Sequence, residues 1–343
     1  MVMMMKEKCH VCSIFLFFGD KDKRLFSNGK TFFLIISHIP RFFPFLLHIN
    51  RKKTTFAEIM KGRRNNYITV KPSSEFDGTM QVRAKKNLGQ HFLTDLSIAE
   101  RIADTLAEYK DTPVLEVGPG MGVLTQFLLQ KGFDLKVVEL DGESVSYLKV
   151  NYPSTLDKRI IEADFLKLKL EEVFEGKSFN LIGNYPYNIS SQIFFKVVDY
   201  RDMIPCCSGM IQKEVADRLA AAPGSKTYGI LSVLIQVWYD VEYCFTVGNH
   251  VFNPPPKVQS AVIKMVRNIV MELPCEEKDL RTLVKNAFGM RRKTLRNCLR
   301  QLIHEWQPEK ADEILAEPLF DKRAEQISVQ EFIDLTARLT TNH

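Results

Sequence analysis

Two short segments carry residues whose types and spacing could do chemistry. Residues 181–188 place a side-chain amide (Asn184), a proline-rigidified turn (Pro186) and an aromatic ring (Tyr187) at the end of an apolar run. Residues 114–122 form an apolar, strand-like run that leads into a turn with three glycines. The first combination suits a flat, amine-bearing base, and the second suits a nucleotide-like ligand. Together they predict a cofactor loop beside a pocket for a methyl acceptor.

The acceptor motif, residues 184–187, is suited to activating the N6 amine of adenine. That amine is a poor nucleophile because its lone pair is delocalised into the ring. Asn184 Oδ1 and the carbonyl of Tyr185 or Pro186 could accept its hydrogens, so that the lone pair turns toward a methyl donor. Tyr187 could stack on a base taken out of its helix, and catalysis would rest on alignment and preorganisation. The motif predicts adenine-N6 methylation; the alternative is an ordinary turn.

The predicted cofactor loop contains Gly118, Gly120 and Gly122. Glycine lets the backbone pass close to a ligand, and the helix expected after the loop would offer unpaired N–H groups to an anion. The spacing is G-x-G-x-G, whereas dinucleotide enzymes use G-x-G-x-x-G. A tight strand-to-helix turn without a ligand is the alternative.

Two acids follow the next predicted strands. Glu139 ends the second strand, where it could accept hydrogen bonds from ribose hydroxyls, and Asp164 ends the third, where it could accept from an adenine amine. Either acid alone could be a strand-end cap. Because ligands bind at the carboxyl ends of such strands, three features at consecutive strand ends favour a cofactor site.

The main body predicts an α/β fold. The predicted strands are residues 114–117, 135–139, 159–163, 179–183 and 207–212, with a late strand at 258–266. The predicted helices are residues 123–130, 143–150, 191–198 and 213–222, with a buried helix at 228–239. Near-continuous apolar strands separated by helices indicate a doubly wound parallel sheet covered on both faces. Helical spacing also begins at Leu96, with Thr94 or Asp95 as its N-cap.

The composition divides the chain into three predicted regions. Residues 1–79 are an atypical N-terminal extension, and residues 80–267 hold the doubly wound domain. Residues 268–343 show helical patterns at 279–288, 292–303 and 329–339 with no strand signal between them, which predicts a small all-helical C-terminal domain.

The extension differs from the rest in composition. It holds 11 of the 24 phenylalanines, and its charge balance is +8 (14 Lys+Arg against 6 Asp+Glu), which leaves −2 (33 against 35) for residues 80–343. Its apolar runs are too short or too interrupted for a spanning helix, and no secretory signal is evident. We interpret it as translated leader before a true start at Met80; a membrane or targeting role and a genuine extra element are the alternatives. No membrane association is expected for residues 80–343.

The seven cysteines have irregular spacing. Cys9 and Cys12 form a CxxC without a second pair, so stray thiols are favoured over a zinc site and no metal is expected. Adjacent Cys206 and Cys207 should face opposite sides of a sheet. This usage is typical of a reducing cytoplasm.

With these segments in view, the chain from Lys85 to its end resembles the ribosomal-RNA adenine dimethyltransferases that use S-adenosylmethionine, and most of all the bacterial kasugamycin-resistance type. Besides the glycine loop and the acceptor motif, three strings carry the resemblance. They are Asn-Leu-Gly-Gln-His-Phe-Leu at 87–93, Phe-Asn-Pro-Pro-Pro-Lys-Val-Gln-Ser at 252–260 and Phe-Gly-Met-Arg-Arg-Lys-Thr-Leu-Arg at 288–296. Tyr185 is a mild departure at a position that varies in the family, and residues 1–79 have no counterpart in it.

The resemblance implies a Rossmann-like methyltransferase domain with a helical C-terminal RNA-binding domain. It implies transfer of four methyl groups from S-adenosylmethionine to two adjacent adenosines near the 3′ end of small-subunit (16S) rRNA, with a role in small-subunit biogenesis. The cofactor contacts that it implies are at His91, Leu93, Gly118, Glu139, Asp164 and Asn184. His91 and Leu93 would lie on an N-terminal segment that folds over the cofactor; without the resemblance, His91 reads as an ordinary loop histidine.

Basic residues in several places are candidates for RNA contacts. They are Arg83, Lys85, Lys86, Lys257, Arg291, Arg292, Lys293, Arg296 and Arg300. On a helix, Arg292, Arg296 and Arg300 would share one face, where phosphates could neutralise their mutual repulsion. A solvated helix face is the alternative. Phe252 could add a second aromatic face for the base. The alternative is that it simply forms the edge of a polyproline-like loop.

We therefore expect a cytoplasmic monomer whose partners are small-subunit rRNA and the assembling 30S subunit. One alternative is a large-subunit rRNA adenine-N6 methyltransferase, which would share the cofactor and acceptor motifs. Another is a non-catalytic RNA- or DNA-binding factor on the same fold. Intact Glu139, Asp164 and Asn184 argue against that second alternative.

Overall fold

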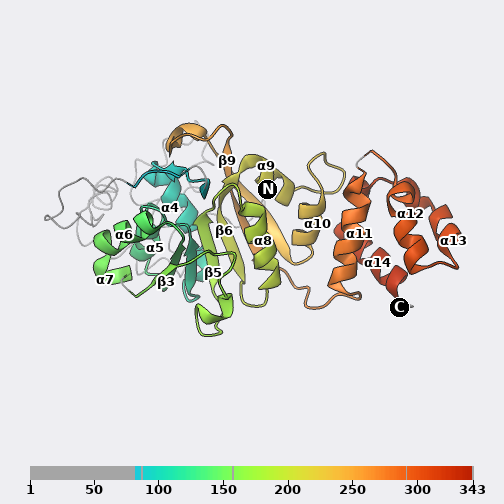
Figure 1. Ribbon diagram of the computed structural model, residues 1–343, viewed down its shortest axis with the longest axis horizontal. Helices are drawn as coiled ribbons and strands as arrows, with labels where there is room; N and C mark the ends of the chain where they lie inside the picture. Colours follow the sequence, from blue (N-terminus) through green and yellow to red (C-terminus); the bar gives the residue numbers. More distant parts are fainter. Residues whose placement is uncertain (1–81, 86–87, 157, 291, 342–343) are drawn as a thin grey trace, which may run out of the picture. The chain divides into compact units, whose positions relative to one another are not determined.

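Strands and helices alternate along the chain (Figure 1). Seven of the strands form one sheet, in the order β4-β3-β2-β5-β6-β9-β7. The structure, a computed structural model, describes residues 82–341 apart from 86–87, 157 and 291. The strands are β2 (Val114–Val117), β3 (Leu135–Glu139), β4 (Ile160–Glu162), β5 (Asn180–Asn184), β6 (Cys206–Gln212), β7 (Tyr239–Val247) and β9 (Ser260–Arg267). The first five run parallel, and β9 is antiparallel to both of its neighbours, β6 and β7.

Some of the predictions lie outside the described residues. These are the extension at 1–79 with its proposed start at Met80, the Cys9/Cys12 pair, and the RNA contacts at Lys86 and Arg291. Within the part of the chain that the structure describes, no helix is both long and apolar enough to cross a membrane.

The five parallel strands are confirmed, with every end within one residue of the prediction. The prediction of an all-parallel sheet was wrong at one edge, where β9 is antiparallel and β7 was overlooked. Residues 228–239 were predicted as one buried helix, but helix α10 covers Ile230–Gln236 and β7 begins at Tyr239. A continuous apolar run does not show where a helix ends and a strand begins, because both are buried there.

Helices cover both faces of the sheet. They are α4 (Leu96–Asp104), α5 (Thr125–Gln130), α6 (Gly142–Asn151), α7 (Pro153–Leu156), α8 (Ser190–Asp199), α9 (Lys213–Leu219) and α10. One apolar cluster joins the sheet to α4, α5 and α6, and a second joins it to α8, α9 and α10. Cys206 belongs to the first and Cys207 to the second, as their adjacency in a strand predicted.

The C-terminal residues are helical, as predicted. The helices are α11 (Glu277–Gly289), α12 (Leu295–Trp306), α13 (Ala311–Ala316) and α14 (Val329–Thr340), drawn in orange to red in Figure 1. In α11 the buried residues Leu280, Leu283, Val284 and Ala287 follow helical spacing and join the apolar cluster of α8. All described residues belong to one compact unit, so a separate domain from residue 268 remains a prediction.

The N-terminal segment, residues 88–94, is tied to a loop far away in the sequence. Its strand β1 (Phe92–Leu93) pairs antiparallel with β8 (Phe252–Asn253), and Thr94 N–H donates to Val251 O at 2.8 Å. Asp95 caps α4 by accepting from two main-chain N–H groups, which decides between the two predicted N-caps. The pairing brings the proline loop, residues 252–260, beside the N-terminal segment.

Gly209 in β6 should tolerate no side chain. Its φ is +150°, and a Cβ there would lie 2.1 Å from Gly183 O on β5 and 2.6 Å from the Tyr185 ring. We expect Gly209→Ala to lower the free energy of unfolding by about 2–3 kcal/mol or more, because β5 and β6 must move apart. Urea unfolding of the full chain measures this change.

Gly289→Ala is the matched control, because nothing lies within 4 Å of a Cβ at this helical position. It should change the free energy of unfolding by less than about 1 kcal/mol. Equal unfolding midpoints for the two variants would contradict the packing described for β5 and β6.

Candidate active site

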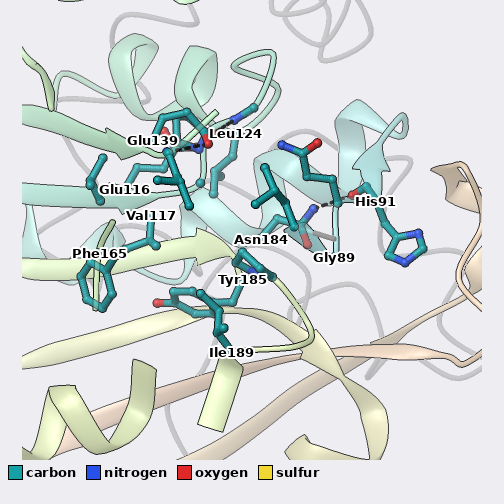
Figure 2. Close-up of a pocket in the computed structure, with 18 of the residues that line it drawn as sticks. Gly89, His91, Glu116, Val117, Leu124, Glu139, Phe165, Asn184, Tyr185 and Ile189 are labelled. Carbon is teal, nitrogen blue, oxygen red and sulfur yellow. Dashed lines mark hydrogen bonds between the residues drawn. The ribbon is translucent and has the colours of Figure 1, made fainter. Parts of the chain in front are cut away.

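A cavity of about 210 Å³ lies at the carboxyl ends of β2, β3 and β5 (Figure 2). It is lined by the glycine loop, by the residues after β3, β4 and β5, and by the N-terminal segment. All ten residues predicted for catalysis or cofactor binding line it. They are His91, Leu93, Gly118, Gly120, Glu139, Asp164, Asn184, Tyr185, Pro186 and Tyr187. One cavity therefore unites segments up to 96 residues apart in sequence.

The glycine loop adopts the backbone shape that its sequence predicts. Gly118 has φ +67° and Gly120 has φ +55°, a region that favours glycine. A Cβ on Gly120 would approach Phe92 to 3.0 Å, so the loop packs closely under the N-terminal segment. The expected helix at 123 begins only at Thr125. Gly120 N–H donates to Glu139 Oε2 at 3.1 Å, so this loop donor orients a carboxyl group of the protein and is not free for an anion of a ligand.

Glu139 is fixed at the end of β3 by three main-chain donors. Besides Gly120 N–H, the N–H groups of Leu140 and Asp141 donate to its Oε1, both at 2.9 Å. Its side chain is buried. Burial raises the pKa of Glu139, and the three N–H groups oppose that rise. The carboxylate is thus held rigidly at the cavity wall.

Glu116 is a cavity residue that the sequence reasoning missed. It lies in β2, its carboxyl accepts a hydrogen bond from Thr125 Oγ1 at 2.7 Å, and burial raises its pKa to about 8. A carboxyl with that pKa is mostly neutral at pH 7. The available signal was an acid within an otherwise apolar strand, where an ionised group would be costly.

Asp164 serves the local turn and also lines the cavity. Its Oδ1 accepts from Leu166 N–H at 2.9 Å, and its Oδ2 lies 3.8 Å from Lys167 Nζ. The strand-end cap that was the alternative for this acid is therefore present, without removing the carboxylate from the cavity wall.

The acceptor motif begins with Asn184, the last residue of β5. Asn184 Nδ2 donates to the main-chain carbonyl of His91 at 3.0 Å, as the dashed line in Figure 2 marks. Because the nitrogen end of the amide is held in this way, Oδ1 is the end that can accept from a ligand amine. A hydrogen bond thus joins the acceptor motif to the N-terminal segment.

The two tyrosines of the acceptor motif have different environments. Tyr185 is 1% exposed, and its hydroxyl donates to Ser208 O at 2.8 Å in the core. Its ring packs edge-on against Phe194 with centroids 5.7 Å apart. Only the main chain of Tyr185 can therefore serve a bound base, as the predicted carbonyl acceptor requires.

Tyr187 is only partly buried, and its ring lies against His91. The ring centroids are 5.3 Å apart with planes tilted by 32°, and His91 Nδ1 lies 2.8 Å from Pro254 O. The Tyr187 hydroxyl is hydrogen-bonded to Ser260 Oγ. Sequence reasoning missed this role of Ser260, because no local pattern links the last residue of the proline loop to a tyrosine 73 residues earlier.

Lys85 fixes the chain just before the N-terminal segment. Its ammonium pairs with Asp141 and, at 3.1 Å, with Glu143, while Gln90 Nε2 donates to Asp141 Oδ2 at 3.4 Å. Burial alone would raise the pKa of Asp141, but the hydrogen bonds from Lys85, Gln90 and Ser144 hold it below its usual value. Lys85 thus has two carboxylate partners within the protein, and its RNA contact stays a prediction.

Two predictions made for the RNA contacts need correction, one about Phe252 and one about the placement of Arg292 on a helix. Phe252 is 4% exposed, packed in the apolar cluster of α4 because β8 pairs with β1, and so cannot offer a second aromatic face. Arg292 precedes α12, which begins at Leu295 after an extended Thr294, so it does not share a helical face with Arg296 and Arg300.

Arg296, like Lys85, is held by contacts within the protein. Its Nε donates to Leu315 O at 2.7 Å and its Nη1 pairs with Asp321 at 2.7 Å, so it links α12 to α13 and to the residues that follow α13. The exposed members of the set are Arg83, Lys257, Arg292, Lys293 and Arg300. Among the described residues, no group of three His, Cys, Asp or Glu side chains could hold a metal ion.

Known proteins resemble this chain along most of its length. The Ribosomal RNA small subunit methyltransferase A of Phocaeicola vulgatus is 65% identical over 255 residues, which cover 74% of this chain and 89% of that protein. Its namesake in Flavobacterium johnsoniae is 56% identical over 259 residues, covering 76% and 97%.

Solved structures share the fold. A dimethyladenosine transferase from Plasmodium falciparum superposes with a TM-score of 0.60 at 24% identity, covering 74% of this chain and 98% of that one. The 23S rRNA methyltransferase ErmE gives 0.54 at 23% identity, covering 71% and 98%. The family model described as ribosomal RNA adenine dimethylase matches residues 81–340. The chain belongs to the ribosomal RNA adenine dimethylase family.

Proposed function

We propose that the protein transfers methyl groups from S-adenosylmethionine to N6 of two adjacent adenosines near the 3′ end of small-subunit rRNA. The observation that carries this proposal is the junction of the acceptor motif with Glu139 and Asp164 around one cavity. The small-subunit substrate is favoured by relatives that are 56–65% identical and bear small-subunit methyltransferase names. We further propose that the protein acts as a cytoplasmic monomer on assembling small subunits.

The cavity wall suits S-adenosylmethionine. Glu139 presents an immobilised carboxylate to ribose hydroxyls, and Asp164 can accept from the adenine amine. The glycine loop packs closely against the N-terminal segment, since a Cβ on Gly120 would meet Phe92 at 3.0 Å. His91 and Leu93 close the cavity from the N-terminal segment. Once bound, the cofactor supplies an electrophilic methyl group on a sulfonium.

The acceptor motif would bind the adenine and orient its amine. Asn184 Oδ1 and the Tyr185 or Pro186 carbonyl accept the two N6 hydrogens, which turns the nitrogen lone pair toward the methyl group. Tyr187 stacks on the extruded base. The pocket must also admit an N6 that already carries one methyl group, which offers only one hydrogen.

The first test is direct. Full-length protein is incubated with S-adenosylmethionine and small ribosomal subunits that lack the modification, and digested RNA is analysed by mass spectrometry. We expect N6,N6-dimethyladenosine at two adjacent adenosines. Dimethylation of large-subunit RNA alone would replace the proposal with the large-subunit activity, and cofactor binding without any methylation would favour a non-catalytic RNA-binding role.

Asn184→Ala should lower kcat about 100-fold or more, because it removes the side-chain acceptor that faces the developing charge on N6. Single-turnover methylation measures this loss, and calorimetry should show a much smaller change in cofactor affinity. Asn151→Ala is the control, since Asn151 also donates from Nδ2 to a main-chain carbonyl, that of Tyr147 at 2.8 Å, away from the cavity. Wild-type kcat in Asn184→Ala would contradict the role of the amide.

The exposed basic residues around the start of α12 should bind RNA phosphates. Because Arg296 is held by Leu315 and Asp321, the informative charge reversal is Arg292→Glu with Arg300→Glu. We expect about tenfold weaker RNA binding and a salt dependence reduced by about two phosphate contacts, with unchanged cofactor affinity. Filter binding at several salt concentrations measures both.

The control reverses two exposed charges at the amino ends of the parallel strands, the side of the sheet opposite the cavity. Lys110 precedes β2 and Lys177 precedes β5, so both lie near the amino ends of these strands, away from the cavity. Lys110→Glu with Lys177→Glu carries the same change in net charge. Equal RNA affinity for the two double variants would refute a specific surface at α12.

A further inference from the structure

Ser260 contacts the acceptor motif from a different part of the sheet. It is the first residue of β9 and is fully buried. Its hydroxyl hydrogen-bonds with the hydroxyl of Tyr187, the residue expected to stack on the acceptor base. This bond links the antiparallel edge of the sheet directly to the acceptor motif.

The position of Ser260 is set by the sheet rather than by a loop. Its backbone pairs with Gln212 of β6 on one side and with Val247 of β7 on the other. The chain just before it is also fixed, because Gln259 O accepts from Lys213 N–H at 2.9 Å. An anchor held by two neighbouring strands moves less than one on an exposed loop.

Tyr187, by contrast, lies on a connection between β5 and α8. Its ring can turn about two side-chain torsions unless its hydroxyl is held. Burial raises the pKa of Tyr187 above its ordinary value, and the hydrogen bond to Ser260 only partly opposes that rise. The hydroxyl therefore stays protonated at neutral pH. His91 contacts the ring and is itself held by Pro254 O at 2.8 Å. The hydroxyl of Tyr187 is thus held by the first residue of β9, and its ring is held by His91, which is itself bonded to the proline loop.

We propose that Ser260 is a positioning residue that sets the plane of the Tyr187 ring and, through it, the alignment of the acceptor adenine. The proposal rests on the proposed function. Methyl transfer requires N6 to lie in line with the methyl group, and misplacement by about 1 Å can cost roughly 100-fold in rate. Ser260 takes no part in bond making; it fixes the ring on which the base stacks.

The neighbouring tyrosine shows why this bond is not simply another core contact. Tyr185 also reaches an adjacent strand through its hydroxyl, at Ser208 O, but its ring is buried and cannot meet a base. Tyr187 remains partly exposed at the cavity wall. The same kind of hydroxyl link thus stabilises the core at Tyr185 and orients a cavity side chain at Tyr187.

The test is a double-mutant cycle of Ser260→Ala, Tyr187→Phe and the double variant. Each keeps an aromatic ring at position 187, so the hydroxyl link to residue 260 is what changes. We expect each single variant to lower kcat about tenfold, with cofactor affinity within about twofold of wild type. The double variant should be no slower than the single ones, because all three lack the same bond. Ser260→Thr, which keeps the hydroxyl, should recover most of the lost kcat.

Tyr243→Phe is the control, since it removes a similar hydroxyl link, to Thr246 at 2.7 Å on β7, outside the cavity. It should leave kcat unchanged. Wild-type kcat in Ser260→Ala, or a double variant slowed by the product of the single effects, would overturn the proposal. If Ser260→Ala does not fold, Tyr187→Phe decides, because wild-type kcat there refutes the link. Absence of methylation by the wild-type protein would instead refute the proposed function itself.

Discussion

The hydrogen bond from Asn184 Nδ2 to the carbonyl of His91 is the contact on which the site depends. It joins the last residue of β5 to the N-terminal segment, which precedes the strands of the sheet in the sequence. An amide has one donating and one accepting end, so fixing the nitrogen leaves the oxygen to accept from a base. The wall over the cofactor and the pocket for the acceptor are therefore parts of one arrangement, and a change in the N-terminal segment reaches the catalytic amide directly.

Several independent contacts keep the N-terminal segment in place. Lys85 and Gln90 hold it to Asp141 at the start of α6, and β1 pairs with β8 at the other end. Gly89 passes so close to the residue after the acceptor motif that a Cβ would lie 2.6 Å from Asn188 Oδ1. The segment is thus gripped by α6, by the proline loop and by the acceptor motif itself. Such support around a reactive group is what precise alignment requires.

Much of this arrangement could be predicted because its signals are local. Continuous apolar runs located β2 and β3 to the residue, and Glu139 was recognisable because ligand sites lie at strand ends. The parts that were wrong or missed depend on contacts distant in sequence. Phe252 is buried by its pairing with β1, Arg296 is held by Asp321, and Ser260 meets Tyr187 across the sheet. No local pattern encodes such partners.

The most direct measurement is a crystal structure of the protein with a non-reactive S-adenosylmethionine analogue and an RNA fragment containing the two adenosines. The account predicts that N6 of one flipped adenine lies within about 3.2 Å of Asn184 Oδ1 while Nδ2 still contacts His91 O. An adenine bound with N6 away from Asn184, or an amide released from His91 and turned out of the cavity, would contradict it.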